Sequence, residues 1–134
     1  MSTTQPSATV TARCHCGAVE IEATLPTRFV AHCFCRSCRT AHAAGSVAFA
    51  GFRKDQVRIV RGAEHIRNYE SSPQTWRKFC TICGTRLGFE SARNPRWADE
   101  FHVPLALFTG PLDRAPHANA FLEERPEWAP YHEF

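Results

Sequence analysis

Seven cysteines give this sequence its most specific chemistry. They stand in three groups, Cys14-His-Cys16-Gly17, Cys33-Phe-Cys35-Arg-Ser-Cys38 and Cys80-Thr-Ile-Cys83-Gly84. Thiolates at such short spacings are typical ligands of Zn²⁺, which takes four sulfur ligands in a closed structural site and three protein ligands in an open catalytic site. An odd number of cysteines disfavours a framework made of disulfides alone. The pattern therefore indicates metal binding.

The first and third groups are close pairs that can share one metal ion. Cys14 and Cys16 point to the same side if their segment is extended, because residues i and i+2 share a strand face. The two-residue spacer between Cys80 and Cys83 lets the chain turn around a metal, and Gly84 allows backbone amides to approach the sulfurs. We therefore predict a structural zinc held by Cys14, Cys16, Cys80 and Cys83. The alternative is that these four are unligated core cysteines.

The middle group offers three thiolates, and no eighth cysteine remains to close a second site. Three protein ligands with one open position form the arrangement of a catalytic zinc. This interpretation makes Cys33, Cys35 and Cys38 the ligands of a second, labile zinc. Two alternatives stay open. Either His32 or His42 closes the shell and the second zinc is structural, or the three thiols stay reduced without a metal.

Short strands must position these cysteines. Two-residue alternation and turn residues predict strands at 18–23, 29–33, 46–52, 57–61, 65–69, 76–80, 86–90 and 102–108. One short helix is predicted at 37–44, where helix formers end before Gly45. A second helical turn is predicted at 94–100. We find no internal repeat and no linker, so the sequence predicts one mainly β domain with one or two short helices.

Length and composition fit a single folded domain. The 134 residues are 43% hydrophobic, 11% aromatic and 22% charged, which supplies a modest core and disfavours disorder. Residues 1–11 are small and polar and are predicted as a flexible N-terminal tail, with 12–134 as the domain. No apolar run approaches the roughly 18 residues of a membrane span, and the first residues do not resemble a secretion signal. We expect a cytoplasmic protein with no membrane partner.

The formal net charge of +3 is weak evidence for a nucleic-acid partner. Seven thiolates and two Zn²⁺ ions would bring this charge to about zero. The basic residues gather in 36–96 and the acidic residues in 97–134, which favours segments that fold against each other. Because no recognised RNA-reading motif is found, we do not expect a nucleic-acid ligand. Arginine predominates over lysine and forms forked contacts with carboxylates, so small acidic ligands fit this composition.

Longer stretches around the cysteines resemble one family. These are CHCGAVEIEA, CFCRSCRTAHAAG, YESSPQTWRKFCTICGTRL and ERPEWAP. Together they resemble the glutathione-dependent formaldehyde-activating enzymes, a family that includes centromere protein V, over roughly residues 11–130. The resemblance implies coiled β-sheets built around a zinc ribbon. It also implies a structural zinc on the outer four cysteines and a catalytic zinc on the central three, the same division that the spacing predicts.

The resemblance implies a carbon–sulfur lyase that joins glutathione and formaldehyde, or a related aldehyde, to S-hydroxymethylglutathione. An open thiolate-bound zinc would hold the sulfur of glutathione, or of another small thiol, as the nucleophilic thiolate. Arg36, Arg39, Arg77 and Lys78 are candidate contacts for the glutathione carboxylates, with none singled out. Family members commonly carry a histidine where this chain has Phe34, so we expect a polar contact beside the open zinc to be missing.

Two other functions are compatible with the cysteine pattern. A non-enzymatic zinc-ribbon module for protein or nucleic-acid partners would need a coherent basic surface, and the salt dependence of DNA binding would reveal it. A redox or metal sensor would release zinc from Cys33, Cys35 and Cys38 on oxidation. The zinc content before and after mild peroxide treatment would reveal the sensor. The sequence does not determine the oligomeric state.

Overall fold

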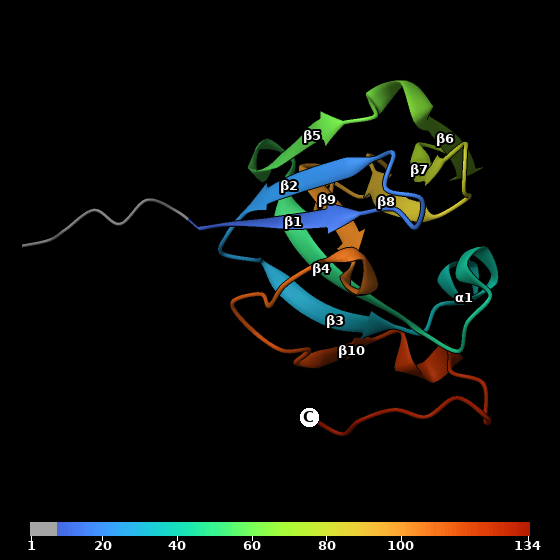
Figure 1. Cartoon of the computed structure of the whole chain (residues 1–134). Coiled ribbons are helices and arrows are strands. Elements are labelled where there is room, and N and C mark those ends of the chain that lie inside the picture. The colour runs from blue at the N-terminus through green and yellow to red at the C-terminus, as the bar shows by residue number, and fades with distance from the viewer. Residues whose placement is uncertain (1–7) are drawn as a thin grey trace, which may run out of the picture.

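Two β-sheets and one short α-helix make up residues 8–134, the part of the chain that the computed structural model describes (Figure 1). The elements in chain order are β1 (Thr9–Arg13), β2 (Glu20–Thr24), β3 (Phe29–Cys33), α1 (Arg36–His42), β4 (Val47–Arg53), β5 (Val57–Arg61), β6 (Ile66–Ser72), β7 (Thr75–Cys80), β8 (Arg86–Ser91), β9 (Glu100–Pro104) and β10 (Ala118–Ala120). Single turns of 3-10 helix lie between several of them. The prediction of a mainly β protein is confirmed.

The strands divide into a small and a large sheet. The small sheet has the order β1-β2-β5 and is antiparallel throughout. The large sheet has the order β10-β3-β4-β9-β8-β7-β6, in which β10 and β3 pair in parallel and the other neighbours are antiparallel. Figure 1 shows β3 and β10 at one end of the large sheet and β6 and β7 at the other, with the small sheet beside them.

The main core lies between the two sheets. Alternate residues of each strand point inward because side chains of a strand alternate between its faces. Ile21 of β2, Phe52 of β4 and Val103 of β9 are each at most 1% exposed and belong to one cluster. The same cluster contains the side chains of Cys14 and Cys80. Two of the predicted metal ligands are therefore continuous with the core.

Strand β1 begins at Thr9, within the segment that the sequence predicts as a tail. Val10 and Ala12 pair with Ala23 and Ile21 of β2, and Ala12 is fully buried. Cross-strand pairing and the burial of small apolar side chains hold this segment in the sheet, where its small, polar composition alone predicts a loose chain. Residues 1–7 of the predicted tail lie outside the described residues.

Two further elements differ from the sequence-based expectation. The segment 94–100, predicted as a helical turn, is a series of tight turns in which the Asn94 side chain accepts a hydrogen bond from the Arg96 amide at 2.9 Å. This side-chain bond competes with helix formation. The three-residue strand β10 has too little sequence to be recognised, and it forms because β3 provides a free edge. Within residues 8–134, no helix is long and apolar enough to span a bilayer.

Candidate functional site

The four outer cysteines come together where the two sheets meet. Cys14 and Cys16 follow β1 of the small sheet, Cys80 ends β7 of the large sheet, and the sulfurs of these three and Cys83 all lie within 4.8 Å of one another. The Sγ atoms of Cys14 and Cys16 are 3.6 Å apart, and those of Cys16 and Cys80 are 3.9 Å apart. A tetrahedral zinc with Zn–S bonds of about 2.3 Å requires sulfur–sulfur distances of about 3.8 Å. The donor set and its spacing fit zinc.

Tight turns shape the backbone around both pairs. The Gly17 amide donates to the Cys14 carbonyl at 3.0 Å, and the Gly84 amide donates to the Cys80 carbonyl at 2.8 Å. The φ angles of these glycines are 79° and 80°, in the left-handed region that glycine adopts without a steric penalty. The Val19 amide donates to the Cys14 sulfur at 3.3 Å. Amide donors of this kind favour the thiolate form of a cysteine.

Thr85 links the two pairs, a role that the spacing of the cysteines does not reveal. Its hydroxyl oxygen accepts a hydrogen bond from the His15 amide at 3.0 Å and lies 3.2 Å from the Cys83 sulfur. This hydroxyl and the Thr85 amide lower the pKa of Cys83 to about 5. Thr85 therefore favours the metal-binding form of the half-buried Cys83.

The central cysteines form a second cluster around the start of α1. Cys33 ends β3, Cys35 is the N-cap of α1 and Cys38 lies in its first turn. Their sulfurs lie within 4.8 Å of one another, and among residues 8–134 no histidine, aspartate or glutamate joins them. The Cys38 amide donates to the Cys35 sulfur at 3.2 Å. Hydrogen bonds from the Cys33 and Cys38 thiols, together with this amide, lower the pKa of Cys35 to about 2.

Neither nearby histidine is drawn into the central cluster. The His42 ring packs edge-on against Phe49, with ring centroids 5.7 Å apart. Burial, together with the charges of Arg77 and Arg86, lowers the pKa of His42 to about 4. The His32 ring stacks with Phe134 near the C-terminus at 6.4 Å. The structure therefore brings three sulfurs together without the histidine that would close the shell.

A buried arginine contacts the central cluster. Arg77 is 3% exposed, and its Nη1 atom lies 3.5 Å from the Cys38 sulfur. Its other nitrogens donate to the hydroxyls of Ser37 at 3.0 Å and Ser71 at 3.2 Å, and the guanidinium lies 5.0 Å from the centre of the Phe89 ring. No carboxylate of residues 8–134 forms an ion pair with it. Because a buried charge needs a counter-charge, the thiolates are its partners.

The other candidate contacts for glutathione lie elsewhere. The Arg39 side chain donates to the Phe34 carbonyl at 2.9 Å and to the Glu124 carbonyl at 3.1 Å, so it fastens the C-terminal segment. The exposed Arg36 is tied to the same segment through its amide. Lys78 follows Arg77 in β7 and lies on the opposite face, where it contacts Glu90 and the Phe101 ring outside the cavity. Of the four candidate contacts, Arg77 is the one that lies at the central cluster. The sequence around Arg77 does not predict that this side chain is buried.

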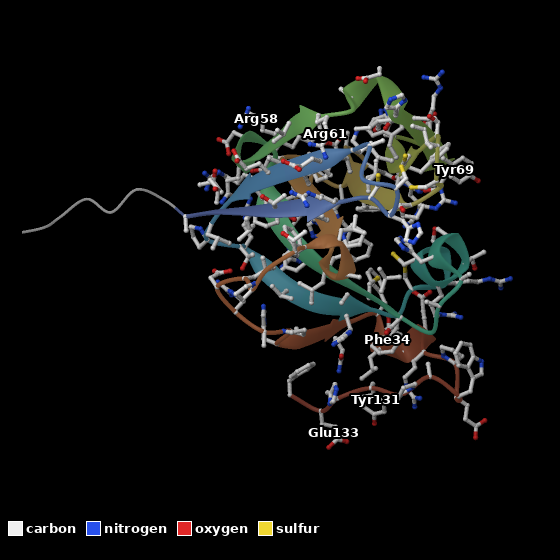
Figure 2. The ribbon with its side chains drawn as sticks, viewed as in Figure 1. Phe34, Arg58, Arg61, Tyr69, Tyr131 and Glu133 are labelled. Carbon is white, nitrogen blue, oxygen red and sulfur yellow. The ribbon has the colours of Figure 1, made fainter. Side chains whose placement is uncertain are left out.

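The central cluster opens into a cavity of about 720 Å³, a size typical of sites for small molecules. Its lining comes from β3, α1, β4 and β10 on one side and from β6, β7 and β8 on the other. His102 of β9, residues 93–95 and Trp97 complete it. Figure 2 shows sulfur in two groups, one near β7 and β8 and one beside α1. The outer cluster is not part of this lining.

Phe34 lies outside the cavity. Its side chain is 1% exposed, its amide donates to the Ala120 carbonyl at 2.9 Å, and it is absent from the cavity lining (Figure 2). The residue between the first two central cysteines therefore packs into the interior of the protein and away from the cavity. The phenylalanine does not place an apolar ring among the groups that a ligand in the cavity would meet.

These features define a mainly β protein with two cysteine clusters of the kind that hold zinc, one of them open to a cavity. The sequence matches the glutathione-dependent formaldehyde-activating enzymes over residues 9–124, and the chain belongs to this family. A crystal structure of a Rhodobacter sphaeroides protein is similar, with 29% identity and a TM-score of 0.65 over 82% of this chain and 99% of that chain. The comparison with curated proteins found no match.

Proposed function

We propose that this protein is a zinc-dependent carbon–sulfur lyase of the cytoplasm that joins glutathione and formaldehyde to S-hydroxymethylglutathione, or a related aldehyde to the corresponding hemithioacetal. The observation that carries the proposal is the three-sulfur cluster, which borders a cavity of about 720 Å³ beside the buried Arg77. Family membership supports the choice of glutathione and formaldehyde. The seven cysteines form no disulfide with one another, which favours a reducing compartment.

The proposal includes two zinc ions with different roles. Cys14, Cys16, Cys80 and Cys83 would hold a structural ion that fastens β1 of the small sheet to β7 of the large sheet. Cys33, Cys35 and Cys38 would hold a second ion with one open position. When bound there, zinc supplies a Lewis acid that keeps a thiol ligand in its thiolate form.

The residues of the cavity supply positioning and charge. Arg77 offsets the negative charge of the central thiolates and holds α1 through Ser37. Arg93 is exposed at the cavity edge, where a glutathione carboxylate can reach it. His102 lines the cavity, and its Nε2 atom forms a hydrogen bond of 2.9 Å with Oε1 of Glu100. We assign to its Nδ1 atom the transfer of the proton that leaves the thiol and ends on the carbonyl oxygen.

Acceleration of the exchange between free glutathione and S-hydroxymethylglutathione tests this function. In solutions of glutathione and formaldehyde, zinc-loaded protein is expected to raise the exchange rate measured by two-dimensional NMR well above that of buffer. The matched control contains the same free zinc and the same concentration of protein with the central cysteines alkylated. Equal exchange rates in the two samples would contradict the proposed lyase.

Replacing Arg77 with methionine is expected to weaken zinc binding at the central cluster about ten- to a hundredfold, as loss of a residue that supports metal ligands commonly does. Methionine keeps an apolar stem against Phe89 but removes the charge that faces the thiolates. Competition with a chromophoric chelator measures the affinity. The control, Lys78→Met, removes a cation from the opposite face of the same strand and is expected to bind zinc like the wild type. An unchanged affinity of the Arg77 variant would contradict the assigned role.

A further inference from the structure

The cavity beside the central cluster has two walls of different chemistry. One wall comes from β6, β7, β8 and the following turn. Beside the rings of Phe89 and Trp97 it carries hydroxyl and guanidinium groups, those of Ser72, Thr75, Arg77, Ser91 and Arg93. The other wall comes from β3, β4 and β10 and carries apolar side chains, those of Phe29, Ala31, Phe49, Ala118 and Ala120. The strand order places these groups of strands at opposite ends of the large sheet, so the cavity lies between them.

Small side chains leave space for a ligand beside the apolar wall of the cavity. Phe29, Ala31 and Cys33 are alternate residues of β3 and share one face. Ala31 pairs with Phe49 of β4 on one side and with Ala118 of β10 on the other. The alanines therefore leave open space along the strand that carries a sulfur of the cluster, and phenylalanine rings border that space.

Aromatic rings line this space in geometries that favour another ring. Phe29 meets His102 edge-on at 4.8 Å between centroids, and Phe89 stacks with His102 at 5.5 Å. Phe49 lies 6.4 Å from Phe89. Such clusters gain energy from an added ring through edge-to-face and offset contacts. Phe49 also packs in one cluster with Cys38, so this surface reaches the reacting position.

Glutathione and formaldehyde leave this wall uncovered. A glutathione carboxylate matches the exposed Arg93 of the polar wall, and formaldehyde carries one carbon and no apolar substituent. We propose, on the basis of the proposed function, that the aldehyde substrate of this protein bears an aromatic ring that lies against Phe29, Phe49 and Ala118. The phenyl group of such an aldehyde covers apolar surface that formaldehyde leaves exposed to water.

The reaction is the same addition with a larger carbonyl compound. The glutathione sulfur forms a bond to the carbonyl carbon, and the π pair of the C=O bond moves to the oxygen. That oxygen takes up the proton that the thiol has released. The product is a hemithioacetal, and no oxidant or reductant is needed.

A comparison of benzaldehyde with formaldehyde tests this inference separately from the proposed function. With glutathione as the thiol, the acceleration over the uncatalysed rate is measured for benzaldehyde and for formaldehyde. We expect the acceleration for benzaldehyde to be at least about tenfold larger, as burial of one ring predicts. Acceleration for formaldehyde that equals or exceeds that for benzaldehyde overturns the inference and leaves the proposed function standing. No acceleration with either aldehyde overturns both.

Binding of stable product mimics gives a readout that does not depend on turnover. S-benzylglutathione carries the ring that the proposed product would carry, and S-methylglutathione corresponds to the formaldehyde product without its hydroxyl. Calorimetry is expected to show at least about tenfold tighter binding of the benzyl compound to the zinc-loaded protein. Ala118→Leu fills the space and is expected to remove most of this preference. The matched control Ala106→Leu adds the same side chain at an exposed position outside the cavity and is expected to keep it. Equal binding of the two mimics by the wild type overturns the inference.

Discussion

Replacing Cys83 with serine is expected to leave a chain that does not fold or that precipitates. The outer cluster joins cysteines 64 residues apart and connects the two sheets. Structural zinc contributes about 10 kcal/mol or more, which is comparable with the whole stability of a domain of this size. Cys83 is the suitable position because it is half-buried, so serine changes the ligand with little effect on packing. Near-ultraviolet circular dichroism and thermal unfolding measure the result.

Cys35→Ser provides the matched control, because it makes the same chemical change in the central cluster. Cys35 is also half-buried and lies outside the main core. Its variant is expected to fold and to retain about one zinc ion per chain. A Cys83→Ser protein that melts like the wild type and keeps all its zinc would refute the structural assignment of the outer cluster.

The same Cys35→Ser variant is expected to lose at least about a hundredfold in lyase activity while it stays folded. Loss of a partner that merely supports a metal ligand commonly costs ten- to a hundredfold, and loss of the ligand itself costs more. The Cys35 sulfur also accepts the hydrogen bond that caps α1, so its removal disturbs the position of Cys38. Exchange NMR measures the activity, and circular dichroism measures the fold.

Glutathione binding identifies the reason for that loss. If the fourth position of the second zinc is open, a thiol fills it, so glutathione is expected to bind more tightly to fully loaded wild-type protein than to protein with about one zinc per chain. In Cys35→Ser this difference is expected to vanish. Calorimetric titration of both forms tests the expectation. Equal affinities in the wild type, or a histidine found as the fourth ligand, would favour a non-enzymatic zinc module instead.

The grouping of the cysteines could be predicted because the close spacing within each group is a local property. The turn at Cys80–Cys83 and the cap at Cys35–Cys38 each depend on a few neighbouring residues, whose spacing the sequence shows directly. The hydrophobic alternation of the central strands is local in the same way, and most of these strands lie within a few residues of their predicted bounds. The family that the motifs around the cysteines resemble is confirmed by the match over residues 9–124.

The tertiary structure decided what surrounds those sulfurs. Arg77 and Cys38 are 39 residues apart, and nothing in the sequence near either residue predicts their contact. The two walls of the cavity come from opposite ends of one sheet, and Ala118 reaches the cavity through a three-residue strand that β3 stabilises. Local patterns determine which atoms can bind a metal, because ligand spacing is set along the chain. Long-range packing determines which charges and rings face those atoms, because residues distant in sequence meet only in the folded protein.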